Sequence, residues 1–179
     1  MKILAICGSL RSKSTNMGLL RYAKANAPEG MEIEIADLSA VPFYNADIAE
    51  KPAAVVTLLQ QMGSADGLLF GCPEYNYSIA PALKNALDWA SREPENKLLS
   101  GKGVALMGAG GGMGTSRSQY HLRQVCVFLN LLPLNKPEVF SNAFSNSFDG
   151  DGNLVDPKIK ENINTQLAAL AQWVKQLQK

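Results

Sequence analysis

Residues 8–16 gather the side chains that proteins use to bind phosphate groups. The segment reads Gly-Ser-Leu-Arg-Ser-Lys-Ser-Thr-Asn and lies between an apolar run and a helical pattern. Its hydroxyl and amide groups can donate hydrogen bonds to phosphate oxygens, and an arginine can donate two at once. We therefore predict a phosphate-binding loop that uses Ser9, Arg11, Ser14, Thr15 and Asn16. The alternative is a serine-rich loop in which one of the last three residues only caps the next helix.

The second candidate segment, residues 73–77, combines aromatic surface with polar groups. It reads Pro73-Glu74-Tyr75-Asn76-Tyr77 and follows another apolar run. The tyrosines can stack on an aromatic heterocycle, and Asn76 can both donate to and accept from its polar edge. A plain turn explains Pro73 and Asn76 but not two tyrosines together. The segment therefore predicts contact with a flat heterocyclic ligand.

The third candidate segment is a glycine cluster at residues 108–114. It reads Gly108-Ala109-Gly110-Gly111-Gly112-Met113-Gly114 and fails the G-x-G-x-x-G spacing in every register, which disfavours a Rossmann-type NAD site. Residues 8–16 also lack the G-x-x-x-x-G-K-[ST] pattern of an ATP or GTP P-loop. Without side chains, the cluster either lets a flat ring approach the backbone closely or forms a mobile loop.

Five short apolar runs alternate with helical patterns, which is typical of βαβ units. The strands are predicted at 2–7, 31–38, 67–73, 102–108 and 137–140. The helices are predicted at 15–27, 53–62, 81–90, 116–129 and 158–177.

The strand patterns also predict the order of the sheet. The runs at 3–7 and 68–70 are apolar on both faces, as central strands are, whereas 31–35 alternates apolar and acidic residues, as an edge strand does. We therefore predict an α/β fold with a doubly wound, five-stranded parallel sheet in the order 2-1-3-4-5, with helices on both faces. One domain is expected to cover residues 1–179. In such a sheet ligands bind beyond the carboxyl ends of the strands, where the three candidate segments lie.

Composition excludes several classes of function. With 17 Lys+Arg against 16 Asp+Glu the formal net charge is +1, which supplies no broad electrostatic footprint for nucleic acid. No apolar run approaches the roughly 20 residues of a membrane span, and the first run is too short for a secretory signal. Cys7, Cys72 and Cys126 are odd in number and lie in apolar sequence, which predicts reduced core thiols and a cytoplasmic protein.

Other catalytic classes also find little support. The single histidine, His121, cannot build a paired-histidine zinc site, and no Cys-x-x-Cys motif is present. A serine hydrolase based on Ser9 would need this histidine, which lies inside a predicted helix. An EF-hand calcium loop beginning at Asp149 fails because Leu154 and Lys160 replace the required glycine and glutamate. A surface turn is the better interpretation of that segment.

Taken together in order, four segments resemble the NADPH-dependent FMN reductase family of flavodoxin-like proteins, in particular its quinone, chromate and azo-dye reductase branch. The matching strings are GSLRSKSTN at 8–16, PEYNYSIAPALKNALDW at 73–89, GGGMGTSRSQYHLRQ at 110–124 and LNKPEVF at 134–140. The resemblance implies that residues 8–16 hold the FMN phosphate and that Pro73, Glu74, Tyr75, Asn76 and Tyr77 lie against the isoalloxazine. It further implies that the cluster from Gly108 to Gly112, which includes Ala109, Gly110 and Gly111, closes over the pyrimidine side.

The resemblance also implies an activity. We expect hydride transfer from NADPH or NADH through FMN to small-molecule acceptors such as quinones, chromate, azo dyes or free flavin. No catalytic side chain is required, although Glu74 is conceivable as a proton donor. The alternative is a non-catalytic FMN electron carrier of the flavodoxin type, against which the charge of +1 argues, because flavodoxins are usually strongly acidic.

Two further points follow from the resemblance. Many relatives carry serine or threonine where this chain has Met107-Gly108-Ala109-Gly110, so contacts of this segment with the flavin are expected to be mainly from the backbone. The family is typically dimeric or tetrameric through the helix at 116–129. A homodimer or homotetramer is therefore expected, with Arg117, Tyr120 and Arg123 as candidate interface residues.

Overall fold

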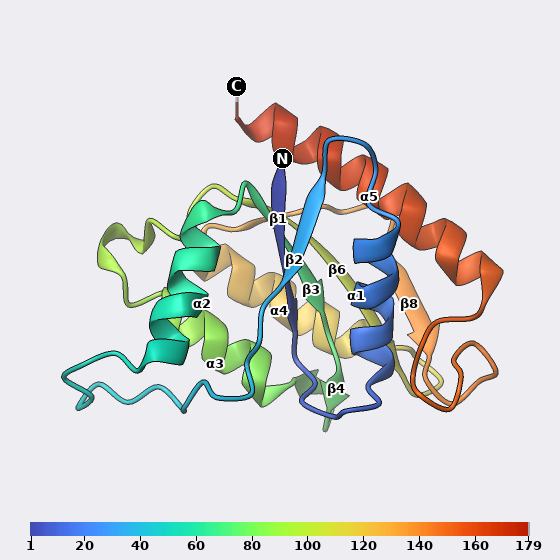
Figure 1. Cartoon of the computed structure of the whole chain (residues 1–179), viewed down its shortest axis with the longest axis horizontal. Coiled ribbons are helices and arrows are strands. Elements are labelled where there is room, and N and C mark those ends of the chain that lie inside the picture. The colour runs from blue at the N-terminus through green and yellow to red at the C-terminus, as the bar shows by residue number, and fades with distance from the viewer. Residues whose placement is uncertain (179) are drawn as a thin grey trace.

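Helices cover both faces of a mainly parallel sheet in the computed structural model, which describes residues 1–178 (Figure 1). The helices are α1 (Thr15–Ala25), α2 (Ala53–Ser64), α3 (Pro81–Ala90), α4 (Ser116–Leu129) and α5 (Pro157–Leu177). The strands of the main sheet are β1 (Lys2–Cys7), β2 (Glu32–Ile35), β3 (Gly67–Gly71), β6 (Gly103–Gly110), β7 (Leu132–Pro133) and β8 (Val139–Asn142). A separate hairpin pairs β4 (Glu74–Tyr75) with β5 (Ser78–Ile79).

The order of the main sheet is β2-β1-β3-β6-β7, and β8 also pairs with β6. The predicted α/β class and the 2-1-3-4-5 order are therefore confirmed, with β6 as the fourth strand. The predicted number of five strands is wrong, because two short strands share the last position. β7 pairs with the first residues of β6, and β8 pairs with its last four.

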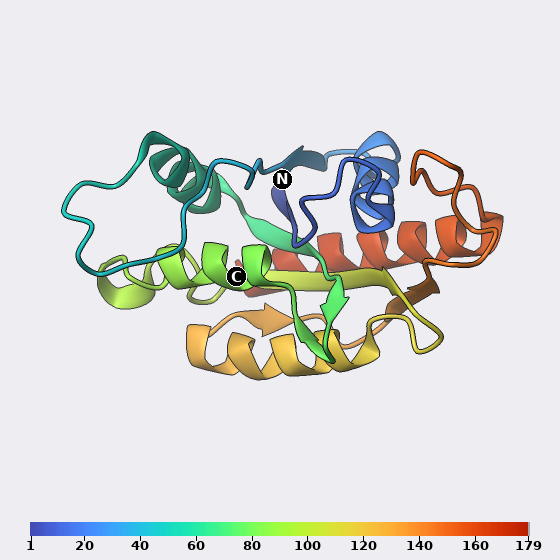
Figure 2. The same cartoon turned by 90° about the horizontal axis from the view of Figure 1, so that it is seen from below.

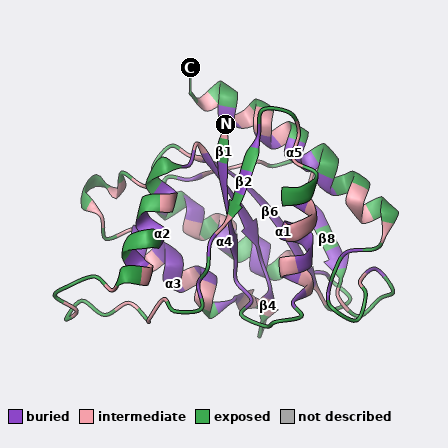
Figure 3. Cartoon of the chain, in the orientation of Figure 1, coloured by how far each residue is buried: buried purple, intermediate pink, exposed green. Residues whose placement is uncertain are grey.

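Alternation along the central strands divides the core into two clusters. Leu4, Ile6 and Phe70 face a cluster that includes residues of α2, α3 and α4, whereas Ile3, Ala5 and Leu69 face one built with α1 and α5. Figure 2 shows α1 and α4 on opposite sides of the sheet, and Figure 3 shows that the central strands are buried while the outer helix faces are exposed. Because β1 and β3 are covered on both faces, their buried residues are apolar on both faces, and only Lys2 at the start of β1 is exposed.

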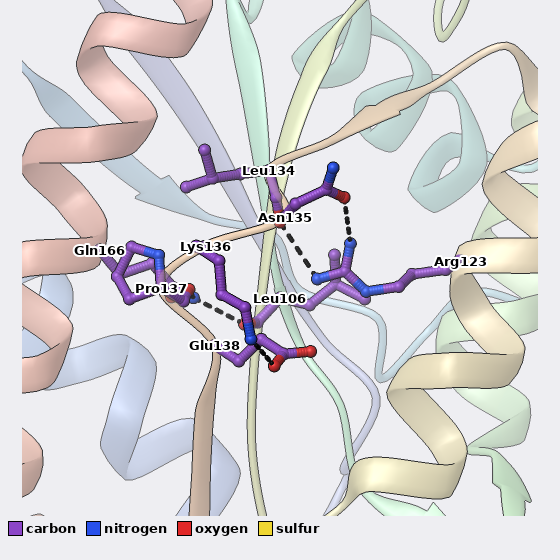
Figure 4. A network of polar contacts seen from close by, with 8 residues as sticks. All are labelled: Leu106, Arg123, Leu134, Asn135, Lys136, Pro137, Glu138 and Gln166. Atoms are coloured by element: carbon purple, nitrogen blue, oxygen red, sulfur yellow. Dashed lines mark hydrogen bonds and ion pairs between the residues drawn. The ribbon is translucent and has the colours of Figure 1, made fainter.

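The segment between β7 and β8 is hydrogen-bonded to side chains of two helices (Figure 4). From α4, Arg123 donates to the carbonyl of Leu134 at 3.1 Å and to Asn135 Oδ1 at 3.4 Å. From α5, Gln166 donates to the carbonyls of Leu106 and Pro137, both at 2.9 Å. Arg123, a candidate interface residue, therefore uses its guanidinium within the chain.

No helix within residues 1–178 is long and apolar enough to cross a membrane. The carboxyl ends of β1, β3 and β6 meet at one edge of the molecule, where the β4–β5 hairpin lies (Figure 1). Residues 9–14 follow β1 and the hairpin follows β3, so both lie next to the end of β6. The candidate segments are thereby brought to the same edge of the sheet.

Candidate functional site

A cavity of about 270 Å³ lies at this edge of the sheet. It lies between the β1–α1 loop, the start of the β4–β5 hairpin, the end of β6 and the segment after β8. The residues that line it are Ser9, Arg11, Ser14, Thr15, Asn16, Pro73, Glu74, Tyr75, Ala109, Gly110, Gly111, Ala143 and Phe144. We call this cavity the loop pocket. The structure thus brings most of the predicted site residues together, and Asn76, Tyr77 and Gly108 lie outside its lining.

The β1–α1 loop contributes the start of α1 to the loop pocket. Ser14 is the N-cap residue, and its Oγ accepts a hydrogen bond from the backbone N–H of Met17 at 3.2 Å. The first N–H groups of a helix have no partners within it, so those of Thr15 and Asn16 remain for a ligand. Ser14 thus serves as the helix cap considered in the alternative interpretation, and it lines the pocket as well.

The two cations of this loop differ in their surroundings. Lys13 forms an ion pair with Asp151 at 2.9 Å. Arg11 lines the loop pocket and its backbone N–H donates to Ser9 Oγ at 3.4 Å. Arg11 is therefore the cation that can neutralise an anion bound beside the start of α1.

The side chain of Asn16 has a structural role. Its Nδ2 donates to the carbonyl of Ala109 at 2.8 Å, and its Oδ1 accepts from the N–H of Ala109 at 2.9 Å. These two bonds are buried and join α1 to β6. These bonds fix the amide of Asn16, whose backbone N–H at the start of α1 has no partner within the helix.

Glu74 caps a helix from a distant part of the chain. Its Oε2 accepts from the N–H groups of Arg117 and Ser118, both at 3.1 Å, and its Oε1 accepts from the Arg117 guanidinium at 3.3 Å. Thr115, the N-cap residue of α4, makes no capping bond through its own side chain. A carboxylate at a helix N-terminus is stabilising, so Glu74 holds the hairpin against α4.

The turn of the hairpin has an unusual backbone. Asn76 and Tyr77 have φ values of 51° and 65°, a conformation that is costly for a tyrosine. The Arg117 guanidinium lies 3.9 Å from the centroid of the Tyr77 ring and stabilises it by a cation–π contact. Tyr77 therefore contacts α4, whereas Tyr75 lines the loop pocket.

The sequence predicted that the glycine cluster follows the fourth strand, but its first three residues are part of that strand. Gly108, Ala109 and Gly110 belong to β6 and pair with β8. A Cβ at Gly108 would lie 2.0 Å from Thr115 Oγ1, and one at Gly110 would lie 2.2 Å from the carbonyl oxygen of Gly114. These glycines are thus required by packing. A Cβ at Gly111 would meet nothing within 4 Å, so the close approach of a flat ring to the backbone, which was expected of the cluster, is possible from Gly111 onward.

Histidine and cysteine chemistry lies outside the loop pocket. His121 Nδ1 is 2.9 Å from the hydroxyl of Ser78, so the structure does not bring it to Ser9 as a hydrolase would require. The three cysteines are buried and free, as predicted, and burial raises the pKa of Cys126 to about 12. Within residues 1–178, no three potential ligands among His, Cys, Asp and Glu are grouped to hold a metal ion.

Sequence reasoning missed Ala143 and Phe144, which line the loop pocket from the segment after β8. Phe144 is 85% exposed. The signal that could have found them is their position after the last predicted strand, because every parallel strand ends at the same edge.

Comparison with known proteins shows what this chain is similar to. The family model described as NADPH-dependent FMN reductase matches residues 1–146. An NAD(P)H-dependent FMN reductase of Pseudomonas aeruginosa is 52% identical over 99% of this chain and 97% of its own length. The quinone reductase of Escherichia coli K12 is 36% identical over the same shares of the two chains. The structure of FerB, a flavoenzyme NAD(P)H:(acceptor) oxidoreductase from Paracoccus denitrificans, aligns with a TM-score of 0.88 at 26% identity, covering 98% of this chain and 97% of FerB.

Proposed function

Because the chain belongs to the NADPH-dependent FMN reductase family, we propose that the loop pocket is its FMN site and that electrons from NAD(P)H pass there to quinones. The protein is an FMN-dependent NAD(P)H oxidoreductase that acts on quinones or similar small-molecule acceptors. The observation that carries the site proposal is the convergence of four segments, distant in sequence, on one cavity.

The residues of the loop pocket fit FMN in their chemistry. Arg11, the hydroxyls of Ser9 and Thr15, and the N–H groups at the start of α1 form an anion-binding end. Tyr75 offers an aromatic face, and the backbone at Gly111 is open to close approach. We propose that the phosphate is held at the first end and the isoalloxazine between Pro73–Tyr75 and Ala109–Gly111. Asn76, Tyr77 and Gly108 would act from just outside this lining.

The protein's own contribution is binding and orientation. The redox chemistry, in which a hydride is taken from the nicotinamide and two electrons reach the acceptor, is supplied by FMN when it is bound. Glu74 is occupied by the N-terminus of α4, so we assign it a positioning role and no proton transfer. Its bonds hold Tyr75 at the pocket by fixing the hairpin that carries it.

The assembly and location of the protein are proposals as well. Tyr120, Val127 and Phe128 of α4 are 71%, 80% and 78% exposed, and their spacing puts them on one helix face. We propose that this face, which we call the α4 face, pairs with a second copy in a homodimer or homotetramer. Three free, buried cysteines fit a reducing compartment, and we propose the cytoplasm. Residues 1–179 would act as one FMN-binding domain.

The test is a visible absorption spectrum of the purified protein reconstituted with FMN, followed by an anaerobic titration with NADPH. We expect bound flavin bands that NADPH bleaches and that a quinone then restores. If dithionite bleaches the bands and NADPH does not, the electron-carrier alternative holds instead. If no flavin is retained, the assignment of the loop pocket is wrong.

A further inference from the structure

A second cavity lies beside the loop pocket and shares only Tyr75 with its lining. Its volume is about 300 Å³, at the lower end of the roughly 300–1,000 Å³ typical of small-molecule sites. Tyr75 lines both cavities, so the two adjoin at this side chain. The other residues that line it are Gly8, Leu10, Leu38, Ser39, Val41, Phe43, Pro81, Ala82 and Asn85. We call it the Phe43 pocket.

One wall of the Phe43 pocket is fixed by hydrogen bonds to α3. The carbonyl of Pro42 accepts from Asn85 Nδ2 at 2.9 Å and from Trp89 Nε1 at 2.8 Å. The N–H of Tyr44 donates to Asn85 Oδ1 at 2.8 Å, and the Tyr44 ring packs edge-on against Trp89. The residues on both sides of Phe43 are thereby hydrogen-bonded to α3.

Although its neighbours are anchored, Phe43 itself is 75% exposed. An exposed aromatic ring is not explained by packing within the chain. Because the backbone on both sides of Phe43 is already ordered, a ligand that contacts the ring would not have to order this segment on binding. The wall is therefore preorganised apolar surface at the mouth of a cavity.

The lining of the Phe43 pocket selects against charged ligands. None of the residues that line it is Asp, Glu, Lys, Arg or His, and the amide of Asn85 bonds to Pro42 and Tyr44. A pyrophosphate or a metal oxyanion would lose its hydration here without a cation to replace it. An uncharged apolar group would gain by burial.

We propose that the Phe43 pocket binds the apolar substituent or second ring of a quinone whose redox-active ring is at the loop pocket. This inference rests on the proposed function, and it names the acceptors that the site favours, which are quinones with an apolar side chain or fused ring. Tyr75 connects the two parts of the acceptor site. The Phe43 pocket contributes binding only, and the electrons and protons of quinone reduction are those of the proposed function.

The test introduces a charge into the Phe43 pocket at the first turn of α3. Ala82 is the second residue of α3, whose first turn has no acidic residue, so Ala82→Glu is favourable for the helix dipole. The matched control is Ala54→Glu, at the second position of α2, whose first turn also lacks an acid. Ala54 lines neither pocket. Each variant is assayed with p-benzoquinone and with a decyl-substituted benzoquinone.

We expect Ala82→Glu to raise KM for the decyl-substituted quinone by about tenfold or more and to leave KM for p-benzoquinone nearly unchanged. Phe43→Ala should act in the same direction, and Ala54→Glu should match the parent protein with both quinones. Equal effects on the two quinones, or no effect, would overturn the inference. So would a change in oligomeric state on Ala82→Glu, because a second copy would then occupy the pocket.

The failure of this inference can be told from the failure of the proposed function. FMN retention and anaerobic bleaching by NADPH are measured first in every variant. If these are lost in the parent protein, the proposed function fails. If they are intact and the KM values do not depend on the apolar chain, only the assignment of the Phe43 pocket fails.

Discussion

Arg11 is the residue on which the phosphate assignment can be tested most directly. Its side chain lines the loop pocket, whereas the nearby cation Lys13 is paired with Asp151. Replacing Arg11 by Ala removes a charge-assisted donor, and we expect FMN affinity to fall by about tenfold or more with the fold unchanged. The measurement is a fluorescence titration of the apoprotein with FMN, with circular dichroism as the check on folding.

Lys13→Ala is the matched control, because it removes a cation from the same loop without removing a pocket side chain. It should leave FMN affinity within about twofold of the parent value, since exposed ion pairs contribute little. Equal losses in the two variants would mean that only general charge matters. Unchanged affinity in Arg11→Ala would remove this residue from the phosphate role.

The Glu74→Gln variant distinguishes a positioning role of Glu74 from a role in proton transfer. Its carboxylate accepts two N–H groups at the start of α4, so Glu74→Gln should lower the free energy of unfolding by about 1 kcal/mol through loss of the charge. The rate of flavin reduction by NADPH should change little. Thermal unfolding and stopped-flow absorbance measure the two effects, with Glu138→Gln as a surface control. A normal stability with a large loss of rate would instead establish a proton-transfer role.

These residues show which features of the site lie beyond sequence reasoning. The types of side chain in 8–16 were enough to predict a phosphate loop, and five of its residues do line the loop pocket. The sequence did not predict which of the candidate side chains bond to other parts of the chain and which remain for a ligand. The partners of Asn16, Glu74 and Lys13 are Ala109, Arg117 and Asp151, all distant in sequence. Only the folded chain shows that these polar groups already have partners.

The end of β6 depends on glycine for packing. A Cβ at Gly108 would lie 2.5 Å from the carbonyl oxygen of Cys72 and closer still to Thr115 Oγ1. Because backbone must shift to admit it, Gly108→Ala should cost about 1–3 kcal/mol of stability. Gly112→Ala, where a Cβ meets nothing within 4 Å, should change stability by less than about 0.5 kcal/mol. Urea unfolding of both variants checks this, and equal effects would contradict it.

The cap of α5 predicts a dependence of stability on pH. Asp156 accepts hydrogen bonds from the N–H groups of Ile159 and Lys158 and from Ser147 Oγ, and these bonds lower the pKa of its carboxyl. A lowered pKa contributes stability that is present above the unfolded value of about 3.9 and is lost as pH falls through the folded value. Asp156→Asn cannot be protonated and should show a shallower fall in unfolding midpoint below pH about 4. Parallel pH profiles would contradict the assignment.

The hydrophobic pattern of the strands predicts their positions in the sheet but not every feature of its edge. The edge position of β2 and the central positions of β1 and β3 followed from alternation, since burial of one or both faces determines which residues a strand can carry. The split of the last edge into β7 and β8 did not follow from this alternation. The segment between these two strands is hydrogen-bonded to Arg123 and Gln166 of two helices, and Pro133 is a residue type that disfavours a strand.

The α4 face is the proposed interface with a second copy of the chain. Tyr120, Val127 and Phe128 expose large apolar groups on one side of a helix whose other side packs on the core. Apolar side chains grouped in this way mark association surfaces more often than isolated ones do. Arg123 is engaged with Leu134 and Asn135, so aromatic and aliphatic contacts would dominate the interface.

Phe128→Asp tests this surface. If the α4 face pairs with a second copy, a buried carboxylate there should weaken association by about 2 kcal/mol or more, and sedimentation velocity should show a shift toward monomer. Val56→Asp, on an exposed position of α2, is the matched control and should leave the assembly unchanged. Because the loop pocket is built within one chain from the residues that line it, FMN should still bind to the Phe128→Asp protein. A parent protein that is monomeric at all concentrations, or a Phe128→Asp protein that assembles normally, would show that the α4 face is not the interface.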